Sequence, residues 1–153
     1  MISELNIEHS AARAAWMRLL SLSAWNDFDS CGRCFATTPH VMLRNPETGL
    51  VMLRGRMGST GAAFNLGEAT VTRCAVRLNS GEEGHAYVMG RNAAHAHLAA
   101  ICDALLQTEE GASDVRGKVL APLEVKLQES QILASTKAAA TKVDFFTMVR
   151  GDD

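Results

Sequence analysis

The sequence is poor in aromatic residues and in proline, and it has no long hydrophobic run. Aromatic residues make up 5% of the 153 residues, and there are three prolines, so an aliphatic core is expected. The apolar run at residues 98–106 is interrupted by Asp103 and falls short of the ~20 apolar residues that span a bilayer. The N-terminus lacks a basic region followed by an apolar stretch, so no secretory signal is expected and the cytoplasm is the expected location.

The sequence also lacks an excess of charge of either sign. The formal net charge is −2, which gives no support to a nucleic-acid-binding role. Hydrophobic residues make up 47%, which is ordinary for a soluble globular protein. The length suits one hydrophobic core, so a single domain over residues 1–153 is expected. Seven methionines in an aromatic-poor chain indicate that part of the apolar content serves an interface.

A second cysteine pair is missing as well. Cys31-x-x-Cys34 stands alone, whereas a zinc site needs a second ligand pair and an iron–sulfur cluster needs more cysteines. A redox pair is expected to open a helix in a βαβ unit, and no such unit is predicted here. We therefore expect no metal site, and a metal- or cysteine-dependent protein is the weakest of three interpretations.

The first half of the chain predicts one helix followed by strands. Helical spacing of apolar residues covers about residues 6–22, and an irregular, extended stretch is expected at 26–38. Strands are predicted at 41–44 and 50–56, with Asn45-Pro46-Glu47-Thr48-Gly49 as the turn of a hairpin. Further strands are expected at 68–79 and 85–89.

The second half predicts helices. Asn92 is a suitable N-cap for a helix to about residue 107, and Ala93, Ala96, Ala100 and Ala104 form a small-residue stripe that allows close approach of another element. A polar connector is expected at 108–117. Pro122 suits the first turn of a helix reaching about residue 142, followed by an apolar tail at 143–151. Strands grouped at about 40–90 and flanked by helices indicate an α+β fold, with an antiparallel sheet of about four strands and helices on one face.

The candidate binding residues lie around a glycine-rich loop and on the strands. Gly58 and Gly61 belong to a loop that can present N–H groups to an anion, but a strand follows it, whereas phosphate-binding loops lead into a helix. The favoured interpretation is a tight connection between two strands. Further possible anion or partner contacts come from the strands and from the start of the following helix: Arg54, Arg56, Arg73, Arg77, Arg91 and His95.

The arginine pairs on the predicted strands allow two interpretations. Arg54 and Arg56 share one strand face, as do Arg73 and Arg77. In a suitable register these four guanidinium groups would form one phosphate-facing or partner-facing patch. The alternative is a solvated sheet face on which the arginines pair with Glu47, Glu68 or Glu82. No catalytic constellation can be assigned from spacing, and His95 and His97 point to different helix faces, so they cannot chelate one ion together.

Several motifs resemble the PhnG family. They are Glu47-Thr48-Gly49-Leu50-Val51, the segment from Arg56 to Gly61, Phe64, the segment from Gly67 to Leu78, Gly90-Arg91 with His95-Ala96, Asp103-Ala104-Leu105, Leu120-Ala121-Pro122-Leu123 and the ending from Val143 to Asp152. The resemblance extends from Trp16-Met17 to the C-terminus. The segment at 26–39, with its cysteine pair, lies outside the pattern.

The resemblance implies a required but non-catalytic subunit of the carbon–phosphorus lyase core. That complex transfers an alkylphosphonate onto the ribose of ATP with release of adenine, giving alpha-D-ribose 1-methylphosphonate 5-triphosphate. The resemblance also implies nucleosidase-like, radical and accessory partner subunits, with two copies of this chain per complex. ATP, and the iron–sulfur cluster with S-adenosylmethionine, belong to the partners, and no cofactor is expected in this chain.

The apolar tail is a possible subunit interface. Phe145, Phe146, Met148 and Val149, with Arg150 beside them, are suited to burial, which stabilises by ~1.5–3 kcal/mol for each large apolar side chain. A tail that folds back on the chain's own core is the equal alternative. The rival function is a stand-alone binder of a phosphorylated ligand through a sheet face rich in glycine and arginine.

Overall fold

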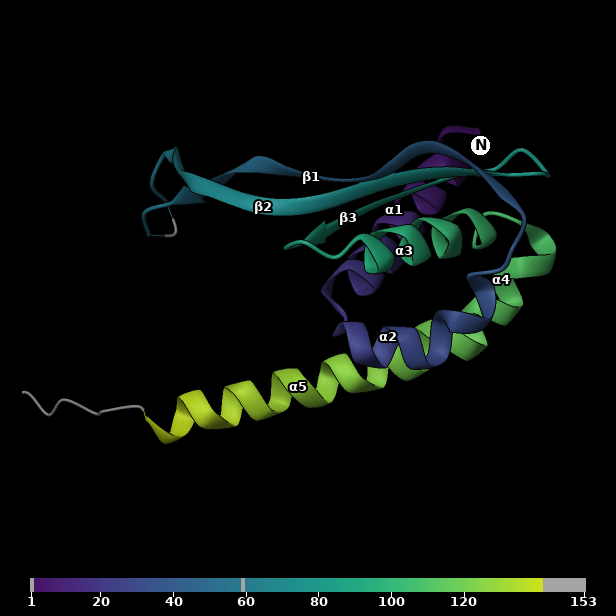
Figure 1. Ribbon diagram of the computed structural model, residues 1–153. Coiled ribbons are helices and arrows are strands. Elements are labelled where there is room, and N and C mark those ends of the chain that lie inside the picture. The colour runs from purple at the N-terminus through teal and green to yellow at the C-terminus, as the bar shows by residue number, and fades with distance from the viewer. Residues whose placement is uncertain (1, 59, 142–153) are drawn as a thin grey trace, which may run out of the picture.

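The computed structural model describes residues 2–58 and 60–141, and within them it shows a three-stranded antiparallel sheet. The strands β1 (His40–Arg56), β2 (Ala63–Leu78) and β3 (Glu83–Met89) follow one another in space as in sequence. Helices precede and follow the strands, and they lie on one side of the sheet (Figure 1). The predicted α+β class with an antiparallel sheet is confirmed.

The helical elements are α1 (Ile2–Leu22), α2 (Trp25–Gly32), the 3₁₀ turn η1 (Arg33–Phe35), α3 (Ala93–Leu105), α4 (Glu109–Val115), the π-helical turn η2 (Arg116–Leu120) and α5 (Ala121–Ala140). Helix α3 packs directly against the strands, and α1 packs against both α3 and β3. None of the described helices combines the length and the hydropathy that a bilayer span requires.

The sheet has three strands rather than about four because two predicted strands are parts of one. Residues 41–44 and 50–56 both belong to β1, and the predicted turn at 45–49 does not form. The register against β2 shifts between Arg44 and Glu47, which marks a bulge at Pro46. Proline fits here because β1 is an edge strand, where a bulge tolerates a residue without an N–H.

Two segments predicted as irregular are helical. Within residues 26–38, α2 and η1 form because Phe28 is fully buried in the core against α3, and tertiary burial overrides weak local preference. The predicted connector at 108–117 contains α4. The Thr108 side chain accepts a hydrogen bond from the Gly111 N–H at 2.9 Å, and Glu109 and Glu110 occupy the first turn, both of which favour a helix start.

Helix α3 is the centre of the core. Nine of its residues are buried, on every side of the helix, as expected for a helix that is covered all round. The predicted N-cap is confirmed, since the Asn92 side chain accepts from the His95 N–H at 2.9 Å. The small-residue stripe lets the helix approach the sheet at Gly84, where an added Cβ would lie 1.9 Å from the Ala100 carbonyl oxygen.

Beyond β3, the other two strands continue alone. Strand β3 pairs with β2 only between Val71 and Arg77. Residues 50–56 of β1 and 63–70 of β2 therefore form a two-stranded ribbon, called here the arm, which extends past the end of β3 (Figure 1). Helix α5 projects from the body toward the same side as the arm (Figure 1).

Candidate functional site

The four predicted arginines do not form one patch. Arg73 donates from Nε to Glu47 Oε1 at 2.7 Å, and Arg77 pairs with Glu83 at 2.6 Å. Arg54 lies opposite Asn65, eight residues along β2 from Arg73, a separation of about 26 Å at the usual strand rise. The pairing of Arg73 with Glu47 agrees with the alternative interpretation, whereas Arg77 pairs with Glu83 rather than with Glu68 or Glu82. Arg54 and Arg56 lie far from both of these pairs.

The glycines of the loop serve the turn at the tip of the arm. Gly58 has a φ of +68°, a conformation that favours glycine. A Cβ on Gly61 would lie 2.2 Å from the Met57 carbonyl oxygen, so the turn excludes a side chain there. The neighbouring Ser59 is outside the described residues. Contact of Gly58, Gly61, Arg54 or Arg56 with an anion stays a prediction.

Arg91 lies in the turn between β3 and α3, with its side chain exposed. A buried threonine holds this turn: the Thr72 hydroxyl donates to the Gly90 carbonyl at 2.7 Å and accepts from the Asn92 N–H at 3.1 Å. Gly90 has a φ of +86°. The turn is therefore fixed, and it presents Arg91 to solvent.

His95 is in the core rather than at the surface. Its Nε2 lies 2.8 Å from the Leu20 carbonyl oxygen, which can only accept, so this nitrogen carries the proton. The ring packs against Trp25 and Phe28. Burial lowers the pKa of His95 below its ordinary value. This histidine joins the end of α1 to α3, and a partner chain cannot reach it without opening the core.

A second histidine contact was missed by the sequence analysis. His97 Nε2 lies 2.9 Å from His40 Nε2, and His40 Nδ1 lies 2.7 Å from the Thr38 carbonyl oxygen. The Thr38 carbonyl can only accept, so it favours the His40 tautomer with the proton on Nδ1, in which Nε2 accepts from His97. Burial, and then the charge of His40, lower the pKa of His97. The residues are 57 positions apart in sequence, and no local pattern indicates the contact.

These histidines predict that the chain loses stability in mild acid. Their folded-state pKa values lie below the ordinary value, about 6.5 in the unfolded chain. The unfolded state therefore binds more protons, and the free energy of unfolding falls as the pH drops through about 6.5 toward the folded values. Urea titrations at a series of pH values from neutral downward should show this slope. The double variant His95→Gln/His97→Gln should show a shallower one, and an equal slope would contradict the assignment.

Asp103 is a buried carboxylate that joins three elements. It accepts from Arg13 Nη2 at 2.8 Å, from Trp16 Nε1 at 2.8 Å and from the His85 backbone N–H at 2.9 Å. Its side chain is fully buried. A single acidic residue inside an apolar helix was the available signal, because buried carboxylates require partners. This cluster fastens α1 and β3 to α3.

Three of the four cysteines have the properties of structural thiols. Burial raises the pKa of the Cys74 thiol to about 11 and also raises those of Cys31 and Cys102, which lowers the fraction of reactive thiolate. Cys34 is exposed and is the central residue of η1. Within residues 2–58 and 60–141, no group of three metal-binding side chains is assembled.

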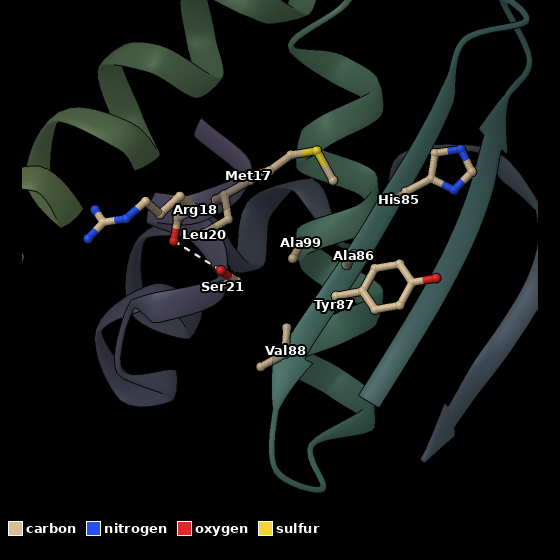
Figure 2. A pocket seen from close by; sticks show the side chains of 9 residues that line it. All are labelled: Met17, Arg18, Leu20, Ser21, His85, Ala86, Tyr87, Val88 and Ala99. Atoms are coloured by element: carbon tan, nitrogen blue, oxygen red, sulfur yellow. Dashed lines mark hydrogen bonds between the residues drawn. The ribbon is translucent and has the colours of Figure 1, made fainter. Parts of the chain in front are cut away.

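Two hollows of the described surface are poorly suited to a nucleotide. One lies between α1 and β3, has a volume of about 170 Å³ and is lined mainly by apolar side chains, including Met17, Leu20 and Val88. Ligand sites usually measure about 300–1,000 Å³. Figure 2 shows His85 and Tyr87 of β3 pointing away from Met17 and Leu20. A hollow of about 790 Å³ is lined by Glu82, Glu109, Glu110 and Asp114, which repel phosphate.

Exposed apolar side chains mark the arm and α5 instead. The arm and its tip expose Leu50, Met52, Leu53, Met57, Phe64 and Leu66, and α5 exposes Val125, Ile132 and Leu133. Several exposed apolar side chains on one element favour an interaction site. The predicted tail interface (Phe145, Phe146, Met148, Val149 and Arg150) lies outside the described residues. The arm was not expected from the sequence, because residues 50–56 and 68–79 were predicted as ordinary strands of one sheet.

Comparisons with known proteins identify relatives. The family model described as "Phosphonate metabolism protein PhnG" matches residues 11–151. The alpha-D-ribose 1-methylphosphonate 5-triphosphate synthase subunit PhnG of Rhizobium meliloti (strain 1021) is 43% identical over 144 residues, which cover 94% of this chain and 92% of that protein.

Proposed function

Because the chain belongs to the PhnG family of phosphonate metabolism proteins, we propose that it is a required, non-catalytic subunit of an alpha-D-ribose 1-methylphosphonate 5-triphosphate synthase complex. The 43% identical relative is named as a subunit of that synthase. The proposal assigns this chain a role in assembly and leaves the chemistry to its partners.

The exposed apolar surface of the arm and α5 carries this proposal. In the arm, Leu50 and Leu66 are 64% and 65% exposed. An isolated two-stranded ribbon is marginally stable in water, and covering such side chains stabilises by ~25 cal/mol per Å² of apolar area. A subunit that buries this apolar area only on assembly is suited to a permanent complex.

The proposed reaction is transfer of an alkylphosphonate onto the ribose of ATP, with release of adenine. The proposed partners are a nucleosidase-like subunit, a radical subunit and an accessory subunit, with two copies of this chain per complex. Because the proposed substrate is ATP, we propose the cytoplasm as the location of the complex. The separation of Arg54 and Arg56 from Arg73 and Arg77 counts against the rival stand-alone phosphate binder. So do the ion pairs of Arg73 with Glu47 and of Arg77 with Glu83.

Co-purification tests the proposal. A tagged chain expressed with the other subunits from its own organism is expected to yield a stoichiometric complex that forms the ribose phosphonate triphosphate. Omission of this chain is expected to abolish product formation, measured by phosphorus NMR. A complex that is fully active without the chain, or a chain that purifies alone, would refute the proposal.

A further inference from the structure

One edge of the sheet is open where β1 forms the arm. Residues 48–53 read Thr-Gly-Leu-Val-Met-Leu and pair with β2 in unbroken register, from Thr72 to Gly67. This edge segment has no charge and no proline, whereas soluble proteins usually protect edges with lysine, proline or bulges. Such protection exists before it, at Pro46 and the bulges of residues 42–47.

The direction of its backbone groups follows from the ladder. The Thr70 carbonyl accepts from the Gly90 N–H at 2.8 Å, on the β3 side, so Thr70 points its polar groups away from β1. In an antiparallel pair, the residue opposite such a position also directs its N–H and C=O groups away from the strand with which it is paired. Leu50 lies opposite Thr70, and Thr48, Leu50 and Met52 therefore direct their N–H and C=O groups to the open edge.

The other edge of the sheet is sealed at its start. The Glu83 carbonyl accepts from Arg13 at 3.1 Å and from Gln107 at 2.8 Å, and the His85 N–H donates to Asp103. No hydrogen bond of this kind reaches the outward groups of residues 48, 50 and 52 within the described part of the chain. The fold therefore protects β3 at this point and leaves the arm segment of β1 available.

We propose that the open edge at residues 48–53 receives an extended strand from a different subunit of the complex. The added strand makes the arm three-stranded, pairs with the outward backbone groups and covers Leu50 and Met52. This is recognition by strand addition, in which the backbone supplies affinity and alternate side chains supply specificity. The inference rests on the proposed function, because it names a partner within that complex.

The charges at the end of the arm favour a different subunit over a second copy. Arg54 and Arg56 follow the open segment and make no ion pair within the described residues. A second copy paired antiparallel through the same segment would set them against residues 44–50, where the one carboxylate, Glu47, already pairs with Arg44 and Arg73. The expected partner strand is apolar at its centre and carries carboxylates where it meets Arg54 and Arg56.

The test uses proline to remove a single edge N–H from the full-length chain. Leu50→Pro deletes an outward N–H without breaking the β1–β2 ladder, and edge strands tolerate this. Tyr87→Pro is the matched control, since the Tyr87 N–H points outward from the opposite edge of the sheet and the residue is 53% exposed. Leu50→Ala retains the N–H. We expect Leu50→Pro to weaken assembly at least about tenfold in co-purification and titration with the other subunits, and Tyr87→Pro to leave it unchanged.

Hydrogen exchange supplies a second readout that needs no variant. The amides of Thr48, Leu50 and Met52 should exchange rapidly in the free chain and slow by about tenfold or more in the complex. Normal assembly of Leu50→Pro, or equally fast exchange of these amides in the assembled wild-type complex, overturns the inference while the proposed function stands. Failure of the wild-type chain to assemble removes both. A dimer of the isolated chain that Leu50→Pro abolishes would make a second copy the occupant and overturn the proposed partner.

Discussion

Replacing Asp103 with alanine is expected to reduce the free energy of unfolding by about 3–5 kcal/mol. The carboxylate is fully buried and accepts from Arg13, Trp16 and the His85 backbone. Its removal leaves the Trp16 indole N–H and the His85 N–H without their acceptor in the interior, where each unsatisfied donor costs about 1–3 kcal/mol. Since small domains are stable by only about 5–15 kcal/mol, the variant should be close to unfolding at 37 °C. Urea denaturation followed by circular dichroism measures the loss.

The matched control is Asp114→Ala. Asp114 makes an exposed pair with Lys118 one helical turn away, and such pairs contribute only about 0.3–0.5 kcal/mol. Asp103→Asn keeps the shape but loses the charge and turns one acceptor into a donor, so it should also be strongly destabilised. An Asp103→Ala variant as stable as Asp114→Ala would show that the cluster does not hold α1 and β3 to α3.

Adding one methyl group at Gly84 is expected to destabilise the chain by at least about 1–3 kcal/mol, the usual cost of overpacking. A Cβ there would lie 1.9 Å from the Ala100 carbonyl oxygen and 2.6 Å from the Ala104 nitrogen. Both atoms belong to the backbone of α3, so the helix must move away from the sheet. Thermal and urea unfolding of Gly84→Ala compare directly with the wild-type chain.

Gly67→Ala is the control with identical chemistry. No atom lies within 4 Å of a Cβ built at Gly67, in the arm segment of β2. Alanine in a strand is usually more favourable than glycine by roughly 0.5–1 kcal/mol, so this variant should be neutral or slightly more stable. Equal effects of the two substitutions would contradict the close packing of α3 on β3.

The sequence predicted the elements whose signals are local. The cap at Asn92, the proline at the start of α5 and the small-residue stripe of α3 were all readable from residue type and spacing. The prediction of a turn at residues 45–49 was wrong because Pro46, usually a sign of chain reversal, also fits a bulged edge strand. The helix α2 was missed because burial of Phe28 against α3, a long-range contact, decides it.

Less of the candidate site could be predicted from the sequence. The register of β1 and β2 decided that Arg54 and Arg56 lie apart from Arg73 and Arg77, and strand register is not written in the spacing of arginines on separate strands. His95 was predicted as an anion or partner contact, yet it lies in the core. Its surroundings come from α1 and α2, which no pattern near residue 95 indicates.

The sequence by itself determined the family, the α+β class and the helix that centres the core, because motif order, local periodicity and caps depend on neighbouring residues. Only the tertiary structure decided which groups stay uncovered. Strand β3 is seven residues long and β1 is seventeen, so the arm extends past the third strand and exposes a backbone edge. That exposure depends on how strands of unequal length pair, and pairing is a property of the folded chain.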